Sequence, residues 1–265
     1  MLELKNITKT FFPGTVNEKV ALKGIDLVLE DGDFVTIIGG NGAGKSTMLN
    51  AISGVWKPDC GQVIIDGEDV TALPEYKRAK YLGRVFQDPM MGTARDMEIE
   101  ENLALARRRG KRRGLKWRIT KAEREEYRRT LADLDLGLED RMTHKVGLLS
   151  GGQRQAVTLL MATINTPKVL LLDEHTAALD PKTAAKVLEL TDRIVERDHL
   201  TTLMITHNMK DAIAHGNRLI MMHEGRIIID VRGEEKKKLT VEDLLAMFAK
   251  ASGSEFTSDR AMLSN

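Results

Sequence analysis

The stretch from Gly39 to Thr47 constrains the fold of this chain more than any other part of it. It reads G-x-x-x-x-G-K-S, the spacing of a phosphate-binding loop. The apolar run 34–38 before it predicts a buried strand, and the run 47–52 after it suits the first turns of a helix. Such a loop directs successive backbone N–H groups at one point, where the helix N-terminus adds partial positive charge. We therefore predict a nucleotide site formed by Gly39, Gly40, Asn41, Gly42, Ala43, Gly44, Lys45, Ser46 and Thr47.

The residue types within this loop suit that chemistry. Glycines let the backbone wrap around phosphate oxygens without a Cβ in the way. Lys45 is expected to reach the β- and γ-phosphates, and the Ser46 hydroxyl is expected to bind Mg²⁺. The alternative is a glycine-rich turn with a surface lysine. Such a match arises by chance in roughly one chain of this length per hundred, and the strand and helix around it make chance rarer still.

Composition and charge restrict the remaining possibilities. The 265 residues predict one large domain, with or without an inserted subdomain, and 42% apolar residues are enough for a full core. The net charge of +1 predicts no general attraction to nucleic acid or membranes. The single cysteine, Cys60, excludes an internal disulfide and a cysteine zinc cluster. No apolar run is long enough to cross a bilayer, so we expect a cytosolic chain whose membrane role depends on a partner.

The pattern of apolar residues predicts an α/β fold. Two early strands, 2–12 and 20–30, are separated by a turn at Pro13-Gly14 and favour an N-terminal antiparallel β-subdomain. Strands then alternate with helices, as where the apolar strand 169–173 precedes a helix that starts at Pro181. This alternation predicts a mostly parallel sheet, and together with the phosphate-binding loop 39–47 it favours a P-loop NTPase core.

A different pattern interrupts this core. Residues 88–165 are expected to form an inserted helical subdomain, because charged helical patterns replace strand signals from about 93 to 148. Within it, residues 107–118 carry eight Lys or Arg and no acid. This basic run either contacts anionic lipid head groups or an acidic partner loop, or is a solvated connector between two helices, which we prefer. The domain is expected to span 1–250, and the polar residues 251–265 to form a disordered tail.

Two carboxylates follow the buried strand 169–173 and narrow the function. A strand that delivers Asp173 at its carboxyl end places it beside the phosphate-binding loop, where it can hold the water shell of Mg²⁺. The next residue, Glu174, is expected to point into the cleft and to orient or deprotonate an attacking water. The alternative is that these are two ordinary acids at a strand end. The phosphate-binding loop upstream makes this alternative less favoured.

A second glycine-rich turn opens a later helix and reads Leu149-Ser150-Gly151-Gly152-Gln153. Its N–H groups and the Ser150 hydroxyl can also bind a phosphate. A second set of γ-phosphate donors is hard to use within one protomer. It makes sense if two protomers face each other and each donates this turn to the other's nucleotide. By itself the pentapeptide could equally be a simple helix cap.

With these motifs the chain resembles the nucleotide-binding subunit of an ATP-binding-cassette (ABC) transporter. The resemblance spans residues 2 to about 230, and 149–153 match the family's signature motif without a change. It implies an ATPase with ATP and Mg²⁺ as cofactors, in which two cassettes close around ATP and reopen after hydrolysis. Nucleotide contacts are then expected from Ser150, Gly151, Gly152 and Gln153 of the facing protomer.

The resemblance also assigns roles to single residues. Gln87 matches the glutamine that senses Mg²⁺ and links to the membrane subunit, so Ser46, Gln87 and Asp173 form the expected metal set. His207 matches the switch histidine that contacts the γ-phosphate, and Asp180 lies in the loop that couples the two sites. Phe11 lies where the family places an aromatic ring under adenine, with Phe12 as a rival one residue away. Taken alone, each could be an ordinary polar or core residue.

One residue departs from the family pattern. Proline usually follows the Asp-Glu pair, and His175 stands there instead, which either alters the adjacent turn or is neutral. The stretch from His175 to Asp180 resembles ATPases of bacterial uptake systems for amino acids or similar small solutes. The resemblance therefore implies separate transmembrane permease subunits, a second copy or a paralogous cassette, and an extracytoplasmic solute-binding protein. It places the chain at the cytoplasmic face of the membrane, held there by the permease.

Two rival interpretations stay open on the sequence alone. A soluble ABC ATPase that acts on ribosomes or DNA usually joins two cassettes or carries a long coiled coil or zinc hook, and the sequence shows one set of motifs and no heptads. A cassette that binds ATP but serves as an inactive half would lack catalytic groups, whereas Glu174 and His207 are both present. We expect no nucleic-acid partner, because the net charge is close to zero.

Overall fold

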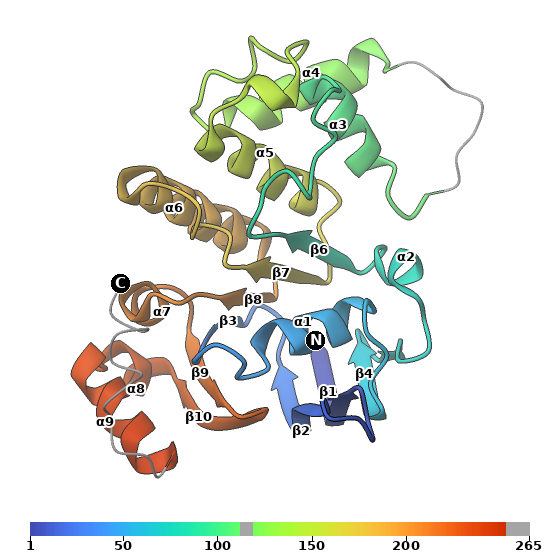
Figure 1. The fold of residues 1–265 in the computed structure, drawn as a ribbon. Helices are drawn as coiled ribbons and strands as arrows, with labels where there is room; N and C mark the ends of the chain where they lie inside the picture. The colour runs from blue at the N-terminus through green and yellow to red at the C-terminus, as the bar shows by residue number, and fades with distance from the viewer. Residues whose placement is uncertain (112–118, 253–265) are drawn as a thin grey trace.

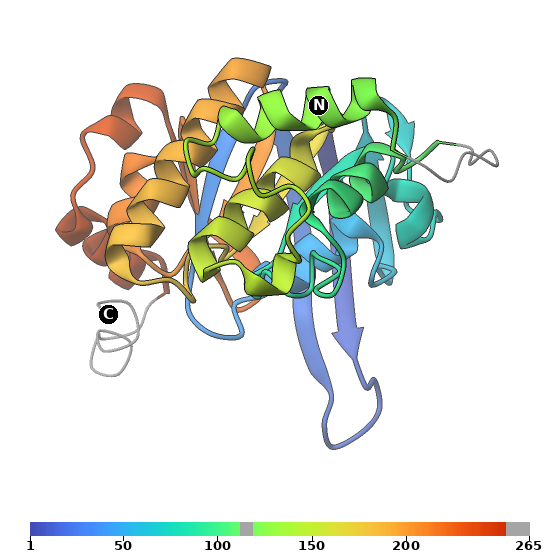
Figure 2. The same cartoon turned by 90° about the horizontal axis from the view of Figure 1, so that it is seen from above.

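The computed structural model describes residues 1–111 and 119–252. Its N-terminal part is an antiparallel sheet in the strand order β2-β1-β4-β5. The strands are β1 (Leu2–Phe11), β2 (Lys19–Leu29), β4 (Cys60–Ile65) and β5 (Glu68–Asp69). The predicted pairing of the first two strands is confirmed, with Leu2 opposite Leu29. Their hairpin extends away from the rest of the molecule, as Figure 2 shows.

The second sheet has the strand order β10-β9-β3-β8-β7-β6. Its strands are β3 (Phe34–Ile38), β6 (Leu82–Val85), β7 (Val169–Asp173), β8 (Thr202–Ile205), β9 (Arg218–His223) and β10 (Arg226–Arg232). All neighbours pair in parallel except β9 and β10, which form a hairpin. The predicted mostly parallel core is confirmed. Because the carboxyl ends of parallel strands meet at one edge, the residues that follow β3, β7 and β8 lie near one another.

Helices flank this sheet, and Figure 1 shows α3, α4 and α5 beyond its β6 edge. The helices of the core are α1 (Lys45–Ser53), α2 (Glu75–Arg78), α6 (Pro181–Asp198), α7 (Met209–Ala214), α8 (Gly233–Lys237) and α9 (Val241–Ser252). Those between β6 and β7 are α3 (Ile99–Arg107), α4 (Lys121–Ala132), the 3₁₀ turn η1 (Val146–Leu148) and α5 (Gly151–Thr163). The described residues between those two strands form no named strand, as expected of a helical insertion.

The core lies on both faces of the parallel sheet because alternate residues of a strand point to opposite faces. Val169 and Leu171 of β7 pack with α1 and the antiparallel sheet. Leu170 and Leu172 of the same strand pack with α5, α6 and the helical insertion. Burial of β7 on both faces explains why its sequence is continuously apolar rather than alternating.

Two predicted segments are only partly described. The disordered tail was expected from residue 251, but α9 continues through 251–252, and residues 253–265 lie outside the described part. Of the basic run, 112–118 lie outside it as well. Arg107 and Arg108 pair with acids of α4, at 3.1 and 3.3 Å, so this part of the run connects helices of the insertion. Within the described residues no helix is long and apolar enough to span a bilayer.

Candidate functional site

The loop between β3 and α1 needs its glycines for steric reasons. Gly39 has φ +152°, and a Cβ built on it would collide with the carbonyl oxygen of Met222. Gly44 caps α1 with φ +102°, and a Cβ there would lie 2.6 Å from the carbonyl oxygen of Ala21. Other residues are strained at such φ values. The loop is therefore folded around a backbone path that only glycine permits, against β2 and β9.

Lys45 is the buried cation of this loop. Its Nζ donates to the carbonyl oxygens of Gly39 at 2.7 Å and Gly40 at 3.2 Å. Burial lowers the pKa of Lys45, while the charges of Glu174 and Asp173 oppose that shift. A desolvated ammonium whose hydrogen bonds within the described residues go to neutral carbonyls interacts strongly with an anion that enters the loop.

A cavity of about 230 Å³ opens beside Lys45, and we call it the nucleotide cavity. It brings together residues that are far apart in the sequence. Its lining consists of Phe11, Lys19, Ala21, Asn41, Gly42, Ala43, Gly44, Lys45, Ser46, Thr47, Glu174 and His207. Of the two aromatic candidates, Phe11 lines it, with its ring edge-on to Trp56 at 5.3 Å, and the exposed Phe12 does not.

Glu174 and His207 meet at the carboxyl ends of two adjacent strands. Glu174 follows β7, His207 follows β8, and Oε1 of Glu174 lies 2.5 Å from Nε2 of His207. The hydrogen bond from His207 holds the pKa of Glu174 below its usual value. Glu174 is therefore ionised at neutral pH and can accept a hydrogen bond from a water molecule.

Asp173 lies beside the nucleotide cavity rather than in its lining, and its nearest cation was not predicted. Oδ2 of Asp173 lies 3.5 Å from Nη2 of Arg84 on β6. Burial raises the pKa of Asp173, and Arg84 opposes that shift. Arg84 also donates to Ser53 at 3.0 Å and to Asn50 at 2.8 Å, both on α1. Nothing in the local sequence of a short edge strand indicates that its arginine will contact an acid on one strand and a helix on the other side.

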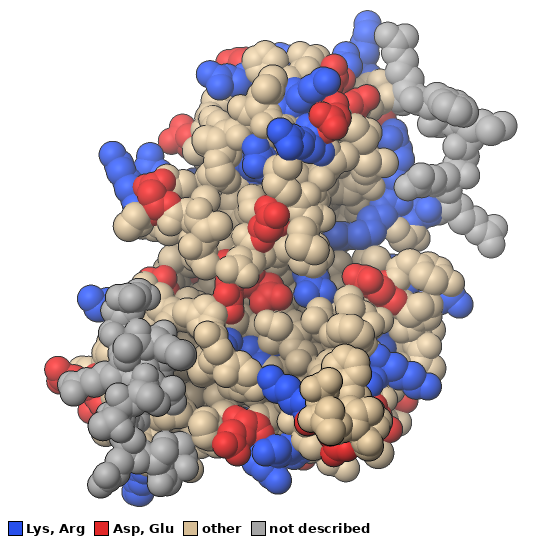
Figure 3. All heavy atoms as spheres, in the orientation of Figure 1, with Lys and Arg blue, Asp and Glu red and all other residues tan. Residues whose placement is uncertain are grey.

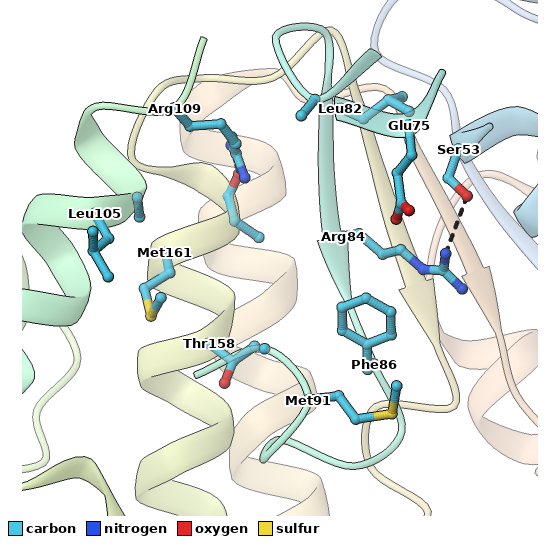
Figure 4. Close-up of a pocket in the computed structure, with 14 residues that line it drawn as sticks. Ser53, Glu75, Leu82, Arg84, Phe86, Met91, Leu105, Arg109, Thr158 and Met161 are labelled. Atoms are coloured by element: carbon cyan, nitrogen blue, oxygen red, sulfur yellow. Dashed lines mark hydrogen bonds between the residues drawn. The ribbon is translucent and has the colours of Figure 1, made fainter. Parts of the chain in front are cut away.

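Arg84 also lines a second cavity, of about 400 Å³, between β6 and α5. Figure 4 shows Arg84 and Phe86 on the sheet side of this α5–β6 cavity, facing Thr158, Met161 and Arg109 across it. Figure 3 shows lysine and arginine side chains beside the furrow between the helical part and the sheets. Gln87 follows β6 next to this cavity, is exposed, and does not line the nucleotide cavity.

The signature turn lies apart from the nucleotide cavity and caps α5. Oγ of Ser150 accepts from the N–H of Gln153 at 3.3 Å, and Oε1 of Gln153 accepts from the N–H of Ser150 at 3.2 Å. A Cβ on Gly152 would collide with Thr183 of α6, so this glycine is also required by packing. Gly151 has more room, since its Cβ would lie 3.1 Å from Leu179.

The remaining two predicted positions are structurally distinct. Asp180 is exposed and caps α6 by accepting from the N–H of Thr183 at 3.1 Å. His175 is buried, and its Nε2 lies 3.1 Å from Oγ1 of Thr191 on α6. Burial lowers the pKa of His175 to about 4, so the ring is neutral at neutral pH. His175 therefore anchors the turn after Glu174 to α6.

Comparison with known proteins agrees with this geometry. The family described as ABC transporter matches residues 22–177. A tyrosine transport ATP-binding protein of Clostridioides difficile is 48% identical over 94% of this chain and 98% of that protein. A methionine import ATP-binding protein of Corynebacterium efficiens is 33% identical over 86% of this chain, which spans 61% of that longer protein.

Solved structures of cassettes match most of this chain. A dimeric ATP-binding cassette in a post-hydrolysis state with ADP and Pi superimposes with a TM-score of 0.75, 33% identity and coverage of 88% of this chain and 98% of that chain. The ADP conformation of an ABC-transporter cassette gives a TM-score of 0.76 at 29% identity, covering 94% and 98%. Together with the family match over more than half of its length, these likenesses show that the chain belongs to the ABC transporter family, as an ATP-binding and ATP-hydrolysing subunit.

Proposed function

We propose that this ATPase drives the uptake of an amino acid, with tyrosine as the first candidate, through separate permease subunits. The observation that carries this proposal is the 48% identity to a tyrosine transport ATP-binding protein, over nearly the full length of both chains. Relatives named for spermidine/putrescine and methionine import are 33–36% identical, so they support import rather than a particular solute.

ATP would bind with its adenine on Phe11 and its phosphates in the loop 39–47. The lining of the nucleotide cavity supports this assignment, because it combines an aromatic ring, backbone N–H groups and the Lys45 ammonium. Backbone N–H groups at the start of α1 suit phosphate oxygens. A Cβ at Gly39 or Gly44 would collide with the carbonyl oxygen of Met222 or Ala21, so the loop keeps this conformation only with glycine at both positions.

Mg²⁺ would be held by the Ser46 hydroxyl and by Gln87, with Asp173 acting through water. The exposed Ser46 lines the nucleotide cavity, and Asp173 lies beside it, so hard oxygen donors gather where the ion is expected. Gln87 is exposed next to the same edge of the sheet. When bound, the ion supplies charge neutralisation at the phosphates of ATP.

Glu174 would orient the attacking water and accept its proton, and His207 would hold Glu174 and contact the γ-phosphate. The 2.5 Å contact between the two side chains and their shared place in the nucleotide cavity support these roles. The lowered pKa of Glu174 makes it a weak base. Its main contribution is therefore to position the water, which accords with phosphoryl transfer depending chiefly on positioning and charge.

A second copy of the chain, or a related cassette, would complete the nucleotide site. The nucleotide cavity of about 230 Å³ is smaller than the roughly 300–1,000 Å³ of a typical ligand site. The signature turn lies outside this cavity, as expected if it serves the partner's nucleotide. Ser150, Gly151, Gly152 and Gln153 would then contact the γ-phosphate in trans, and Asp180 would lie at the interface.

The permease would dock on the α5–β6 cavity, beside Gln87. The exposed Tyr76 and Met91 flank this part of the surface and suit a protein contact. Such docking would hold the chain at the cytoplasmic face of a membrane, and uptake would further require an extracytoplasmic solute-binding protein. Tight, salt-sensitive binding to RNA or DNA would favour the soluble, non-transport class of ABC ATPases instead.

Co-expression with candidate permease subunits, chosen by their co-purification with this chain from its native host, tests the proposal. The purified complex, reconstituted in liposomes with the solute-binding protein outside and MgATP inside, should accumulate labelled tyrosine or a competing amino acid. The Glu174→Gln complex, prepared in the same way, should not. Failure of every amino acid, with ATPase activity intact in the complex, would overturn the solute assignment but not the ATPase function.

A further inference from the structure

The contact between Glu174 and His207 joins two side chains that lie beyond the ends of their strands. The backbone N–H groups of Glu174 and of Thr206, the residue before His207, continue the sheet by donating to the carbonyls of Ile205 and Ile37, each at 3.1 Å, but these bonds do not fix either side chain. Glu174 also adopts a left-handed φ of 49°, which a non-glycine residue keeps only where its surroundings impose it. Contacts outside the sheet must therefore help to fix the 2.5 Å contact.

The first of these contacts ties the residue after Glu174 to helix α6. The hydroxyl of Thr191 donates its hydrogen to the carbonyl of Val187 at 2.8 Å. It has no second hydrogen, so at 3.1 Å it must accept from Nε2–H of His175. The peptide that carries Glu174 is thereby anchored in α6 through the side chain of His175.

The next residue of α6 holds the element that follows His207. Oδ2 of Asp192 lies 2.7 Å from Nδ1 of His215. His215 comes directly after α7, and α7 begins two residues after His207. The far end of that helix is therefore fixed to α6 as well, one residue along from the anchor of His175.

We propose that Thr191 and Asp192 are positioning residues for ATP hydrolysis, which set the contact between Glu174 and His207 through α6. This inference rests on the roles proposed above for that pair. α6 is one continuous helix of 18 residues, and its cap is Asp180, which is expected to face the second cassette. A shift of α6 when the dimer closes would move both anchors together and so adjust the catalytic contact.

The variant Thr191→Val tests the first anchor, because valine keeps the shape of threonine and removes the acceptor for His175. Its matched control is Thr163→Val. Thr163 is also buried, and its hydroxyl donates to the carbonyl of Leu159 in its own helix at 2.9 Å, but in the described part of the chain it has no histidine partner. The difference between the two variants isolates the bond from His175.

We expect Thr191→Val to lower kcat about tenfold relative to Thr163→Val with little change in KM for ATP, since a misplacement of about 1 Å can cost a hundredfold. Thr191→Ser, which keeps the hydroxyl, should restore kcat. A second measurement is independent of turnover. The ring N–H resonance of His207, identified by its loss in His207→Gln, should move in Thr191→Val and stay in place in Thr163→Val.

Equal kcat and an unmoved His207 resonance in Thr191→Val would overturn the proposal. If that variant fails to fold, Asp192→Asn replaces it, because this side chain is 36% exposed and less critical for packing. Asp192→Asn should likewise lower kcat and shift the resonance, and wild-type behaviour in both would also overturn the proposal. The variant Glu174→Gln distinguishes a failure of the positioning proposal from a failure of the proposed function. If this variant hydrolyses ATP at the wild-type rate, the catalytic role proposed for Glu174 is wrong.

Discussion

Nη2 of Arg84 lies 3.5 Å from Oδ2 of Asp173, so one guanidinium joins the wall of the α5–β6 cavity to the predicted magnesium-binding acid. The same group donates to Asn50 and Ser53 of α1. Its cation also lies 4.6 Å from the ring of Phe86. Arg84 therefore connects β6, β7 and α1 at the point where the predicted permease surface approaches the nucleotide site.

Replacing this arginine should destabilise the fold. Arg84→Met leaves Asp173 without its nearest cation and Asn50 without a donor, so we expect the free energy of unfolding to fall by roughly 2–3 kcal/mol. The control is Arg109→Met, which removes a cation from the same cavity where Nη2 bonds to the carbonyl of Ala162 at 2.9 Å. Urea denaturation compares the two variants, and an equal loss would show that the contacts of Arg84 have no special weight.

Glu174→Gln should separate ATP binding from hydrolysis. The substitution keeps the shape of the side chain and removes the charge that orients water, so the rate should fall about a hundred- to ten-thousandfold. Lys45 and the loop amides are untouched, so ATP should still bind. The closed dimer should then accumulate, and sizing chromatography should show a dimer with MgATP where wild type with ADP is monomeric. Adding Ser150→Arg should abolish this dimer, and a surviving dimer would show that the signature turn is only a helix cap.

Lys45→Ala should abolish ATP binding, because Lys45 is the buried cation of the loop and lines the nucleotide cavity. Fluorescent nucleotide binding and ATPase assays measure the loss. The exposed Lys57 lies outside the lining of the nucleotide cavity, and Lys57→Ala should bind ATP as wild type does. Near-normal turnover in Lys45→Ala would contradict the phosphate-loop assignment.

Phe11→Ala should weaken ATP binding by roughly 1–3 kcal/mol, the usual contribution of a base stacked on an aromatic ring. Phe12→Ala should have little effect, because Phe12 is 66% exposed and does not line the nucleotide cavity. Titration with ATP and with inorganic triphosphate separates adenine contacts from phosphate contacts, since triphosphate should bind both variants alike. If Phe12→Ala weakened ATP binding more than Phe11→Ala, the adenine site would lie at Phe12.

Lys236 should make stability rise with pH in the alkaline range. Burial lowers its pKa from 10.5 to about 8. Between these values the unfolded chain holds a proton that the folded chain has released, so the contribution of this group to the free energy of unfolding increases as pH rises from about 8 to 10.5. Lys236→Met should lose this increase, and the exposed neighbour Lys238 provides the control Lys238→Met. Urea denaturation at several pH values across that range measures the free energy of unfolding of both variants. The same pH dependence in Lys236→Met and Lys238→Met would contradict this prediction.

Sequence patterns predicted the elements of this fold well where one local signal dominated. The strand 169–173 was predicted with its observed bounds, because four buried apolar residues end at a carboxylate. Other bounds differ by a residue or two, as for β1, which ends at Phe11 because the positive φ of 51° at Phe12 begins the turn. Helix α9 runs to Ser252 although polar composition had suggested that the tail starts at residue 251.

Tertiary partners set the limit of what the sequence could reveal. The family resemblance implied that Glu174 and His207 act at one site, but Arg84 and Thr191 gave no signal, since their partners lie 34 and 16 residues away in the chain and meet them only in the folded structure. The consequence of His175 was left open for the same reason. Gln87 was assigned by resemblance, and in the structure it lies two residues beyond the end of β6, outside the lining of the nucleotide cavity.

The capping box at Ser150 affects the thermodynamics of assembly. A hydroxyl has two acceptor sites and one hydrogen, and the cap occupies an acceptor site, so the hydrogen stays available for an anion. The rotamer of Ser150 is already fixed in the isolated chain, which means that its conformational entropy is lost on folding rather than on association. A dimer that meets ATP through such pre-organised groups can be specific without being permanent, as a cycle of repeated closing and opening requires.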